Sequence, residues 1–536
     1  MGGYKYNVFV EEKTITMYNY DENCFRLERS FEMTEKELMK LQNGSDVRGI
    51  ALEGVEGEAV NLRPEAANLI AAAFVRFLAE KLGKDAGELK IAVGHDSRLS
   101  AESLKEAALQ GILAEGAQAF DCRMASTPAM FMSIVFPETQ MDGSIMITAS
   151  HLPFNRNGLK FFTADGGLEK ENIIELLQTA AGLEERSADL GLAKPLALID
   201  IYAASLCEKI RQGINSSDNY EKPLSGMHIV VDAGNGAGGF FAGKVLAELG
   251  ADTSGSLYLE PDGSFPNHIP NPENQAAMDA IKGAVLASRA DLGIIFDTDV
   301  DRMSAVLPDG QQISRNALIA MMAAILAPDY PGSTIITDSV TSDELADFLE
   351  NKLQLKHHRY MRGYKNVINE CIRLNKAGTV SPLAIETSGH GALSENYYLD
   401  DGAYLAVKLL IAAAKARQEG KVLADLVADL KHPAEEKEYR LKIKGVEDFR
   451  SYGKNVLAEF EKRAKAQGIQ MAVPSYEGIR LVFPGEGWVL LRMSLHDPNM
   501  PMNMESQQAG GCAKLTEKVK ALVEGFEHLD ISVLNG

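Results

Sequence analysis

The sequence has few cysteines and no apolar run long enough to cross a membrane. Its 536 residues include five cysteines, which are far apart, odd in number and without metal-ligand spacing, so we expect reduced thiols without assigned chemistry. The longest apolar run, 317–327, is too short for a bilayer and predicts a buried helix. Glu11 and Glu12 interrupt the N-terminal stretch where a secretory signal would lie. We therefore expect a cytoplasmic protein with no membrane partner.

Positive charge is also scarce. The formal net charge is -21, which argues against nucleic acid as a partner. An anionic small ligand would need arginines and lysines gathered locally in an otherwise acidic protein. With 46% hydrophobic and 24% charged residues, the chain is long enough for several packed domains. A monomer and a homodimer are both compatible with this composition.

A recurring pattern organises most of the chain. An apolar strand, a short polar loop and a helical stretch follow one another at 91–96, 229–234 and 334–338, which predicts three related α/β domains with mixed, mostly parallel sheets. We expect helices at 64–82 and 403–416. From about 435 the polar and apolar residues alternate, and helices are expected at 446–467 and 514–526. This part predicts a smaller C-terminal α+β domain.

One hydroxyl group follows a buried strand. The short apolar run 144–147 predicts a strand buried on both faces, and Ser150 comes directly after it in the segment Thr148–Pro153. Ligands of open α/β sheets bind at the carboxyl ends of such strands. The pattern favours a serine that carries a phosphoryl group, although the segment could be an ordinary turn.

Three carboxylates follow another apolar strand, 292–296. Asp297, Asp299 and Asp301 alternate along the loop, which places three hard oxygen ligands on one side and suits Mg²⁺. Carboxylates so close together repel one another unless a cation or basic groups balance them. A helix cap is the alternative. A calcium loop of the twelve-residue kind is disfavoured because its glycine and closing glutamate are missing.

Two further loops have polar groups suited to a phosphorylated sugar. Glu386 and Ser388 follow the apolar stretch 382–385, and a carboxylate two residues from a hydroxyl can bind neighbouring sugar hydroxyls. A plain turn with a satisfied glutamate is the alternative. Arg492 and Ser494 follow the apolar stretch 488–491, where an arginine, a hydroxyl and loop amides form a cradle for a phosphate.

These four loops, in this order, resemble those of the α-D-phosphohexomutase family, the phosphoglucomutase and phosphomannomutase group. Shorter segments support the resemblance at 43–49, 93–100, 126–128, 232–236, 261–263 and 400–402. It runs from about residue 40 to the C-terminus. It implies four domains around one central cleft, and an isomerase that interconverts hexose 1-phosphates and 6-phosphates through a phosphoserine and a 1,6-bisphosphate intermediate, which is also the activator.

The resemblance also implies roles for individual residues. Ser150 would be the phosphoserine and would hold Mg²⁺ together with Asp297, Asp299 and Asp301. Arg302 would steady the transferred group. The residues expected to move protons or support the reacting hydroxyl are Arg48, Lys160 and His390, with Lys160 ranked first as the base. The residues expected to bind the sugar or its second phosphate are Glu386, Ser388, Arg362, Arg492, Ser494 and His496.

The expected domain boundaries follow the loops. We expect an N-terminal extension at 1–40 and domains at 41–196, 197–312, 313–434 and 435–536, each domain contributing one of the four loops in turn. The resemblance does not explain the extension.

The sequence departs from the family pattern at several positions. Leu152 stands where asparagine is usual, Thr298 where glycine is usual, and Leu495 and His496 replace the usual residues after the phosphate-loop serine. Tyr364 replaces a common histidine, and Arg362 with Lys365 can supply the missing charge. Thr387 differs from both the glucosamine and the glucose or mannose mutases.

Three alternative functions stay open beside a mutase for glucose or mannose phosphates. The first is a phosphoglucosamine mutase. The second is a Mg²⁺-dependent phosphatase with an aspartate nucleophile. The third is a non-catalytic sugar-phosphate-binding protein, which the altered phosphate loop would suit.

Overall fold

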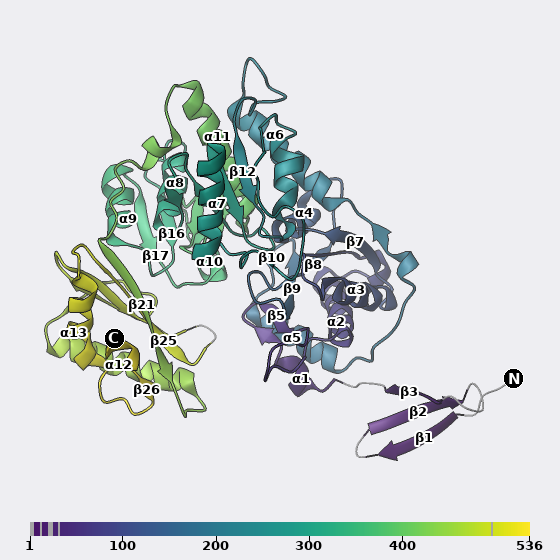
Figure 1. Ribbon diagram of the computed structural model, residues 1–536. Coiled ribbons are helices and arrows are strands. Elements are labelled where there is room, and N and C mark those ends of the chain that lie inside the picture. Colours follow the sequence, from purple (N-terminus) through teal and green to yellow (C-terminus); the bar gives the residue numbers. More distant parts are fainter. Residues whose placement is uncertain (1–4, 11–12, 20–24, 30–32, 495–496, 536) are drawn as a thin grey trace. The chain divides into compact units, whose positions relative to one another are not determined.

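The computed structural model describes residues 5–10, 13–19, 25–29, 33–494 and 497–535 (Figure 1). The chain divides into two compact units. Unit 1 comprises Met1–Arg123 and Ser133–Leu196, and unit 2 comprises Met124–Met132 and Ala197–Gly536. Within the described ranges, no helix is both long and apolar enough to span a membrane.

The described residues of unit 1 form two sheets. The first is antiparallel, in the order β1 (Lys5–Val10), β2 (Lys13–Asn19) and β3 (Phe25–Arg29), and it lies in the N-terminal extension, which the family resemblance does not explain. The second has eight strands in the order β11-β7-β6-β8-β9-β5-β4, with β10 paired to β9. Its strands are β4 (Gln42–Asn43), β5 (Asp46–Ile50), β6 (Lys90–His95), β7 (Gln118–Met124), β8 (Gly143–Ile147), β9 (Arg156–Thr163), β10 (Gly166–Gly167) and β11 (Lys194–Pro195).

Helices α1 (Glu35–Met39), α2 (Pro64–Leu82), α3 (Ala101–Ala114) and α5 (Lys170–Ala181) pack with the larger sheet. Helix α2 has the bounds expected from the sequence. Pro64 occupies its first turn, where a missing backbone N–H costs nothing, and Gly83 ends it with φ at 62°. Its apolar side chains pack against those of α3 and β6 in one core.

In the described part of unit 2 the strands form three sheets, in the orders β12-β13-β14-β15, β17-β16-β18-β19-β20 and β22-β23-β24-β25-β21-β26. The strands of the first two are β12 (Ile229–Asp232), β13 (Leu292–Phe296), β14 (Met303–Val306), β15 (Gln312–Ile313), β16 (Thr334–Thr337), β17 (Lys356–Arg359), β18 (Leu383–Ile385), β19 (Gly391–Leu393) and β20 (Leu399–Asp400). Those of the third are β21 (Glu435–Ile443), β22 (Gln470–Met471), β23 (Ile479–Phe483), β24 (Gly487–Leu491), β25 (Asn499–Ser506) and β26 (Leu529–Asp530).

The helices of unit 2 match most sequence expectations. They are α4 (Thr127–Val135), α6 (Leu198–Ile214), α7 (Gln275–Ser288), α8 (Asn316–Leu326), α9 (Asp343–Asp347), α10 (Tyr364–Lys376), α11 (Gly402–Gln418), α12 (Phe449–Ala466) and α13 (Gly511–Val523). The apolar run 317–327 forms α8, which is almost entirely buried. The final helix begins three residues before the predicted start, at Gly511, and ends at Val523 instead of 526.

The α/β class with mixed sheets and a C-terminal α+β domain is confirmed, but the α/β sheets are not mostly parallel, because antiparallel hairpin strands extend their parallel pairs. The α/β sheets are mixed: β8 lies parallel to β6, β13 parallel to β12, and β18 parallel to β16, while antiparallel strands extend each sheet. The third sheet of unit 2 is antiparallel, with helices α12 and α13 packed in its core, as an α+β domain. The parallel strands β8, β13 and β18 end in the loops that contain Ser150, Asp297 and Glu386.

Candidate active site

Ser150 lies in a tight loop at the carboxyl end of β8. All five residues of β8 are buried, as expected for a central strand. Ser150 has φ at 49°, a left-handed conformation that few non-glycine residues adopt. Its backbone N–H donates to the Thr148 hydroxyl over 2.8 Å, and its own Oγ lies 3.3 Å from His151 Nδ1. The loop therefore holds the hydroxyl in a defined place, which is what a nucleophile requires.

The side chain of Arg98 holds this loop in place. Its side chain is fully buried, and Asp96 Oδ2 lies 3.4 Å from its Nε. Its guanidinium donates to four backbone carbonyls of the loop, those of Ser150, Leu152, Pro153 and Arg156. The sequence does not predict this role for Arg98, because its partners lie more than fifty residues away.

Arg48 and Lys160 lie on the two strands that follow β8 across the sheet. Arg48, on β5, donates from Nη2 to Asp46 over 2.9 Å and from Nη1 to the Thr148 carbonyl. A Cβ at Gly158 would lie 2.7 Å from Arg48 Cδ, so the glycine makes room for the arginine stem. Lys160, on β9, is buried. Both residues thus lie on strands of the unit 1 sheet whose strand β8 leads into the Ser150 loop.

In unit 2, the loop after β13 brings three carboxylates together. Ligand oxygens of Asp297, Asp299 and Asp301 lie within 4.8 Å of one another, and all three residues are buried. This confirms the geometry expected from their spacing. Burial, and next the charges of Asp301 and Asp299, raise the pKa of Asp297 well above its usual range. Hard oxygen ligands that repel one another fit a divalent cation.

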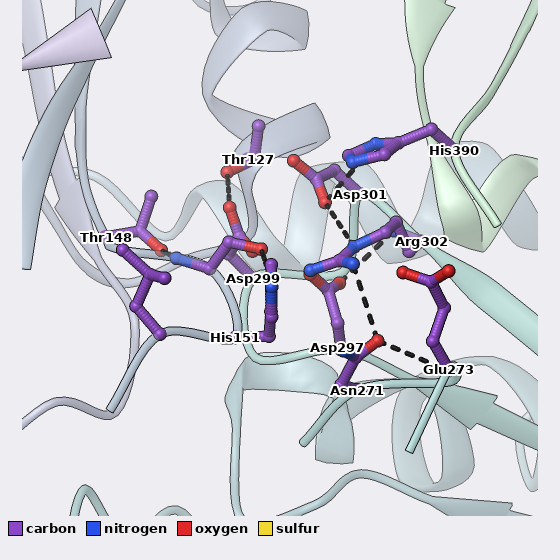
Figure 2. Close-up of polar contacts among 12 residues, drawn as sticks. Thr127, Thr148, His151, Asn271, Glu273, Asp297, Asp299, Asp301, Arg302 and His390 are labelled. Carbon is purple, nitrogen blue, oxygen red and sulfur yellow. Dashed lines mark hydrogen bonds and ion pairs between the residues drawn. The ribbon is translucent and has the colours of Figure 1, made fainter. Parts of the chain in front are cut away.

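Arg302 braces this loop. Its backbone N–H and Nε donate to the two oxygens of Asp297 over 3.2 and 3.1 Å, and its Nη1 donates to Asn271 over 3.4 Å. Figure 2 shows the guanidinium between Asp297 and Asp301. Arg302 is only 2% exposed. Within unit 2 its side chain therefore stabilises the acidic loop.

The start of α4 fixes the middle carboxylate. Thr127 Oγ1 donates to Asp299 Oδ2 over 2.5 Å, and its backbone N–H donates to the Asp299 carbonyl over 2.9 Å (Figure 2). Segment 126–128 supports the family resemblance, but the sequence does not predict a role for Thr127, because Asp299 lies 172 positions later.

Glu386 and Ser388 follow β18, as expected, and both are buried. Glu386 Oε1 accepts from the Gly363 N–H over 2.6 Å. Burial and the nearby Asp338 raise the pKa of Glu386 to about 7, against the opposing effects of His390 and Arg362. The Ser388 hydroxyl has no hydrogen-bond partner among the described residues. Such a group is suited to a ligand hydroxyl.

His390 ends the same loop beside the acidic cluster. Its Nδ1 is paired with Asp400 and lies 3.8 Å from Asp301 Oδ1, and the Tyr364 ring stacks on it at 5.4 Å (Figure 2 for Asp301). Burial alone would lower the pKa of His390, but the carboxylates of Asp400 and Asp301 raise it to about 9. A raised pKa favours the charged form of the ring at neutral pH.

The arginine expected to bind phosphate lies at the end of β24. Arg492 is buried, and its Nε has no hydrogen-bond partner in the described part of the chain. Its Nη1 lies 3.6 Å from Glu477 Oε1. Burial lowers the pKa of Arg492, and the nearby charge of Arg362 acts in the same direction. The Ser494 hydroxyl accepts from the Asp497 N–H over 3.2 Å.

The charge of Arg362 acts on Arg492, although the Arg362 side chain is 25% exposed, and two neighbouring guanidiniums suit a dianion. Glu477, which the sequence interpretation missed, joins them: its Oε2 accepts from the Arg362 backbone N–H over 3.0 Å. The remaining expected phosphate-loop residue, His496, and its neighbour Leu495 lie outside the described residues.

Family sequence profiles match the chain in three consecutive stretches. They are described as phosphoglucomutase/phosphomannomutase α/β/α domains I, II and III, and they match residues 39–185, 204–310 and 314–433. Together they cover more than half of the chain.

Curated relatives match over most of their own length. A phosphoglucomutase from Neisseria gonorrhoeae is 28% identical, covering 90% of this chain and 96% of the relative. A probable phosphoglucosamine mutase from Methanocella arvoryzae is 30% identical over 83% and 94% of the two chains. A phosphomannomutase/phosphoglucomutase from Pseudomonas aeruginosa is 29% identical over 78% and 84%.

A solved structure shares the fold. It is a phosphoglucomutase/phosphomannomutase family protein from Burkholderia thailandensis, with a TM-score of 0.73 and 24% identity, covering 92% of this chain and 98% of that one. With the three domain profiles and relatives that match almost end to end, the chain belongs to the phosphoglucomutase/phosphomannomutase family of α-D-phosphohexomutases.

Proposed function

We propose that this chain is a phosphohexomutase that interconverts the 1- and 6-phosphates of glucose, mannose or both. Its family consists of isomerases that transfer a phosphoryl group within one molecule. The observation that carries the proposal is the convergence of Asp297, Asp299 and Asp301, three buried carboxylates whose oxygens could hold a cation. Carboxylates so placed suit a phosphoryl-transfer centre.

Ser150 is the group that carries the phosphoryl in this proposal. Its Oγ gives the phosphoryl to the free hydroxyl of the bound sugar phosphate, and later takes the other phosphate back from the 1,6-bisphosphate. Mg²⁺, when bound by Asp297, Asp299 and Asp301 with the Ser150 phosphate, would neutralise charge on the transferred group. Arg98 supports this role because it fixes the carbonyls around Ser150.

Protons at the reacting hydroxyl are handled by cations in both units. Lys160, Arg48 and His390 are the groups proposed for this work, and the raised pKa of His390, about 9, makes it a proton donor at neutral pH. Lys160 becomes the base only if its amine is neutral. The two cations of unit 1 lie on strands of the Ser150 sheet.

The sugar and its second phosphate are bound by the loops of unit 2. Glu386 and Ser388 bind the ring hydroxyls, and Arg362, Arg492, Ser494 and His496 bind the phosphate that is not reacting. The Arg492 Nε without a partner supports this assignment, because a buried donor left unpaired costs about 1–3 kcal/mol until a ligand satisfies it.

A phosphoglucosamine mutase is the second candidate, favoured by the Methanocella arvoryzae relative. Thr387, which differs between the subgroups, donates its hydroxyl to Asp338 over 2.7 Å and is buried. It is thus engaged inside the protein, and we place glucose and mannose first. We further propose a cytoplasmic monomer or homodimer with domains at 41–196, 197–312, 313–434 and 435–536 after an extension at 1–40.

Turnover of three substrates in parallel tests the proposal. Purified protein would be given glucose 1-phosphate, mannose 1-phosphate or glucosamine 1-phosphate with Mg²⁺ and a trace of the matching 1,6-bisphosphate, and the 6-phosphate would be measured. We expect turnover of the glucose or mannose compound that needs both additions. Turnover of glucosamine 1-phosphate alone would select the second candidate.

Ser150→Ala is the decisive variant. We expect it to abolish turnover, and peptide mass spectrometry should locate a phosphate on Ser150 in the wild type. Ser103→Ala, on the solvent side of α3 in the same unit, is the matched control and should keep full activity. Phosphate release that survives Ser150→Ala would indicate a phosphatase with an aspartate nucleophile, and substrate binding without turnover would indicate a non-catalytic protein.

A further inference from the structure

The segment Asp400-Asp401-Gly402 joins β20 to α11, and the proposed function gives it no task. Asp401 is structural. Its Oδ1 accepts from the Tyr404 N–H over 2.8 Å at the start of α11 and from the buried Tyr202 hydroxyl over 2.7 Å. A helix cap and a buried hydroxyl partner are sufficient reasons for this carboxylate.

Gly402 is also structural. Its N–H donates to the Val300 carbonyl over 3.1 Å, and a Cβ at this position would lie 2.7 Å from the backbone of Arg302. Only glycine lets the first turn of α11 approach the acidic loop so closely. Hydrogen bonds at the helix cap thus explain Asp401, and close packing explains Gly402.

Asp400 has a different environment. Its Oδ1 accepts from the Gly391 N–H over 2.9 Å, which ties the carboxylate to β19. Its Oδ2 forms an ion pair with Nδ1 of His390, the residue that precedes Gly391, and the two side chains are only 8% and 16% exposed. One carboxylate thus holds both the backbone and the imidazole ring of this turn.

A second contact fixes the face of the ring. The Tyr364 ring stacks on the imidazole with 5.4 Å between centroids and 25° between planes. Asp400 fixes one edge of the ring and Tyr364 one face. The Nδ1 edge is turned toward carboxylates, since Asp301 Oδ1 also lies 3.8 Å from Nδ1. The opposite edge, with Nε2, is the one that a substrate hydroxyl can use.

We propose that Asp400 is a positioning residue, which binds Nδ1 of His390 so that Nε2 is presented to the reacting sugar hydroxyl. The inference rests on the proposed part of His390 in proton transfer. A carboxylate that orients a histidine in this way works through the ring and does not touch the substrate.

The adjacent aspartates provide a matched pair of variants. Asp400→Asn keeps the size of the side chain but replaces the ion pair, and we expect kcat to fall about 100-fold with KM within about threefold. Asp401→Asn weakens the α11 cap, so it should lower the melting temperature while kcat stays within about threefold. Asp400→Glu, which restores a carboxylate, should recover part of the loss.

The ring itself gives a readout that does not need activity. The chain has ten histidines, so ¹⁵N-histidine labelling gives a tractable spectrum, and His390→Asn identifies the His390 signals by their disappearance. We expect Asp400→Asn to shift the Nδ1 resonance of His390, and Asp401→Asn to leave it unchanged.

These results separate the two proposals. An unchanged Nδ1 resonance in Asp400→Asn, or a kcat equal to that of the wild type, would overturn the role of Asp400. A loss of kcat accompanied by the same loss of thermal stability as in Asp401→Asn would also overturn it. If the wild type turns over no sugar phosphate, the proposed function fails, whereas the resonance still decides whether Asp400 holds the ring.

Discussion

Two arginines of the C-terminal domain, Arg480 and Arg492, are equally buried but differently paired. Both are about 5% exposed or less. Arg480, on β23, donates to the Ser339 and Thr341 carbonyls over 3.1 and 3.2 Å and to Asp343 over 2.9 Å. Its guanidinium also lies 3.6 Å from the centroid of the Trp488 ring. The guanidinium of Arg480 is thus hydrogen-bonded, ion-paired and stacked within the protein.

Arg492 is buried with fewer partners, and its Nη1 donates only a long hydrogen bond, 3.4 Å, to the Met493 carbonyl. Its nearest carboxylate is Glu477, at 3.6 Å, and its Nε has no hydrogen-bond partner among the described residues. A buried cation is costly unless it is paired and hydrogen-bonded. Arg480 therefore stabilises the fold, whereas Arg492 keeps a hydrogen-bond donor that a ligand can use.

The largest effect is expected from Arg492→Met, which keeps an apolar stem and removes the cation. We expect KM for the sugar phosphate to rise about 100-fold, equivalent to about 2.7 kcal/mol, because charge-assisted hydrogen bonds to phosphate are lost. Thermal stability should stay the same or rise, since an underpaired buried charge disappears. Initial-rate kinetics and melting curves measure both. A destabilised variant with normal KM would show that Arg492 has a structural role, as Arg480 does.

Arg480→Met should give the reverse result. Two carbonyls and the Trp488 ring would lose the guanidinium, and we expect the free energy of unfolding to fall by about 2–4 kcal/mol with kcat/KM of the folded enzyme nearly unchanged. Trp488 is the only tryptophan, so its fluorescence in urea reports unfolding at this site. Equal stability of Arg480→Met and the wild type would contradict the assignment.

A smaller effect is expected at Glu505, which lies beside Arg480 and accepts from Trp488 Nε1 over 2.9 Å. Burial raises the pKa of Glu505 to about 8, although Arg480 opposes the shift. The unfolded value is about 4.3. The stabilising contribution of this carboxyl is therefore complete below that value and is lost as pH rises through about 8.

Glu505→Gln removes this titration. We expect the variant to lose less stability than the wild type between pH 5 and 8, by at most about 1.4 kcal/mol per pH unit, measured by urea unfolding at each pH. Glu517→Gln, at an exposed position on α13, serves as the control and should follow the wild-type profile. Parallel profiles for Glu505→Gln and the wild type would mean that the carboxyl is ionised throughout, held by Arg480.

The sequence predicted contacts between residues that are close along the chain and could not predict contacts between distant ones. The four loops were found because short apolar strands such as β8 and β13 are visible as runs, and polar residues directly after them lie at strand ends. The three aspartates were found because alternation along a loop brings i and i+2 side chains together. These are local relations, and the structure confirms their geometry.

The residues that were missed depend on distant partners. Arg480 contacts residues more than 130 positions earlier, and Arg98 contacts carbonyls more than fifty positions later. Glu477 binds the backbone of Arg362, 115 positions away. No periodicity reports such contacts. The early start of α13 also depends on a distant partner, because the N–H groups of Gly510 and Cys512 donate to the carboxylate of Glu435 on β21, 75 and 77 positions earlier.

The smallest effect is expected at Ser494, which shares the phosphate loop with Arg492. Its hydroxyl accepts from the Asp497 N–H over 3.2 Å, while its backbone N–H donates to the Asn499 carbonyl over 3.1 Å and does not depend on the side chain. Ser494→Ala therefore leaves the loop closed and removes one neutral hydrogen bond, worth about 1 kcal/mol. We expect KM to rise about fivefold and kcat to stay constant. A rise in KM as large as that of Arg492→Met would mean that the Ser494 hydroxyl shapes the loop around Arg492. Phosphate binding would then depend more on the geometry of this loop than on the presence of a buried guanidinium, which Arg480 also has.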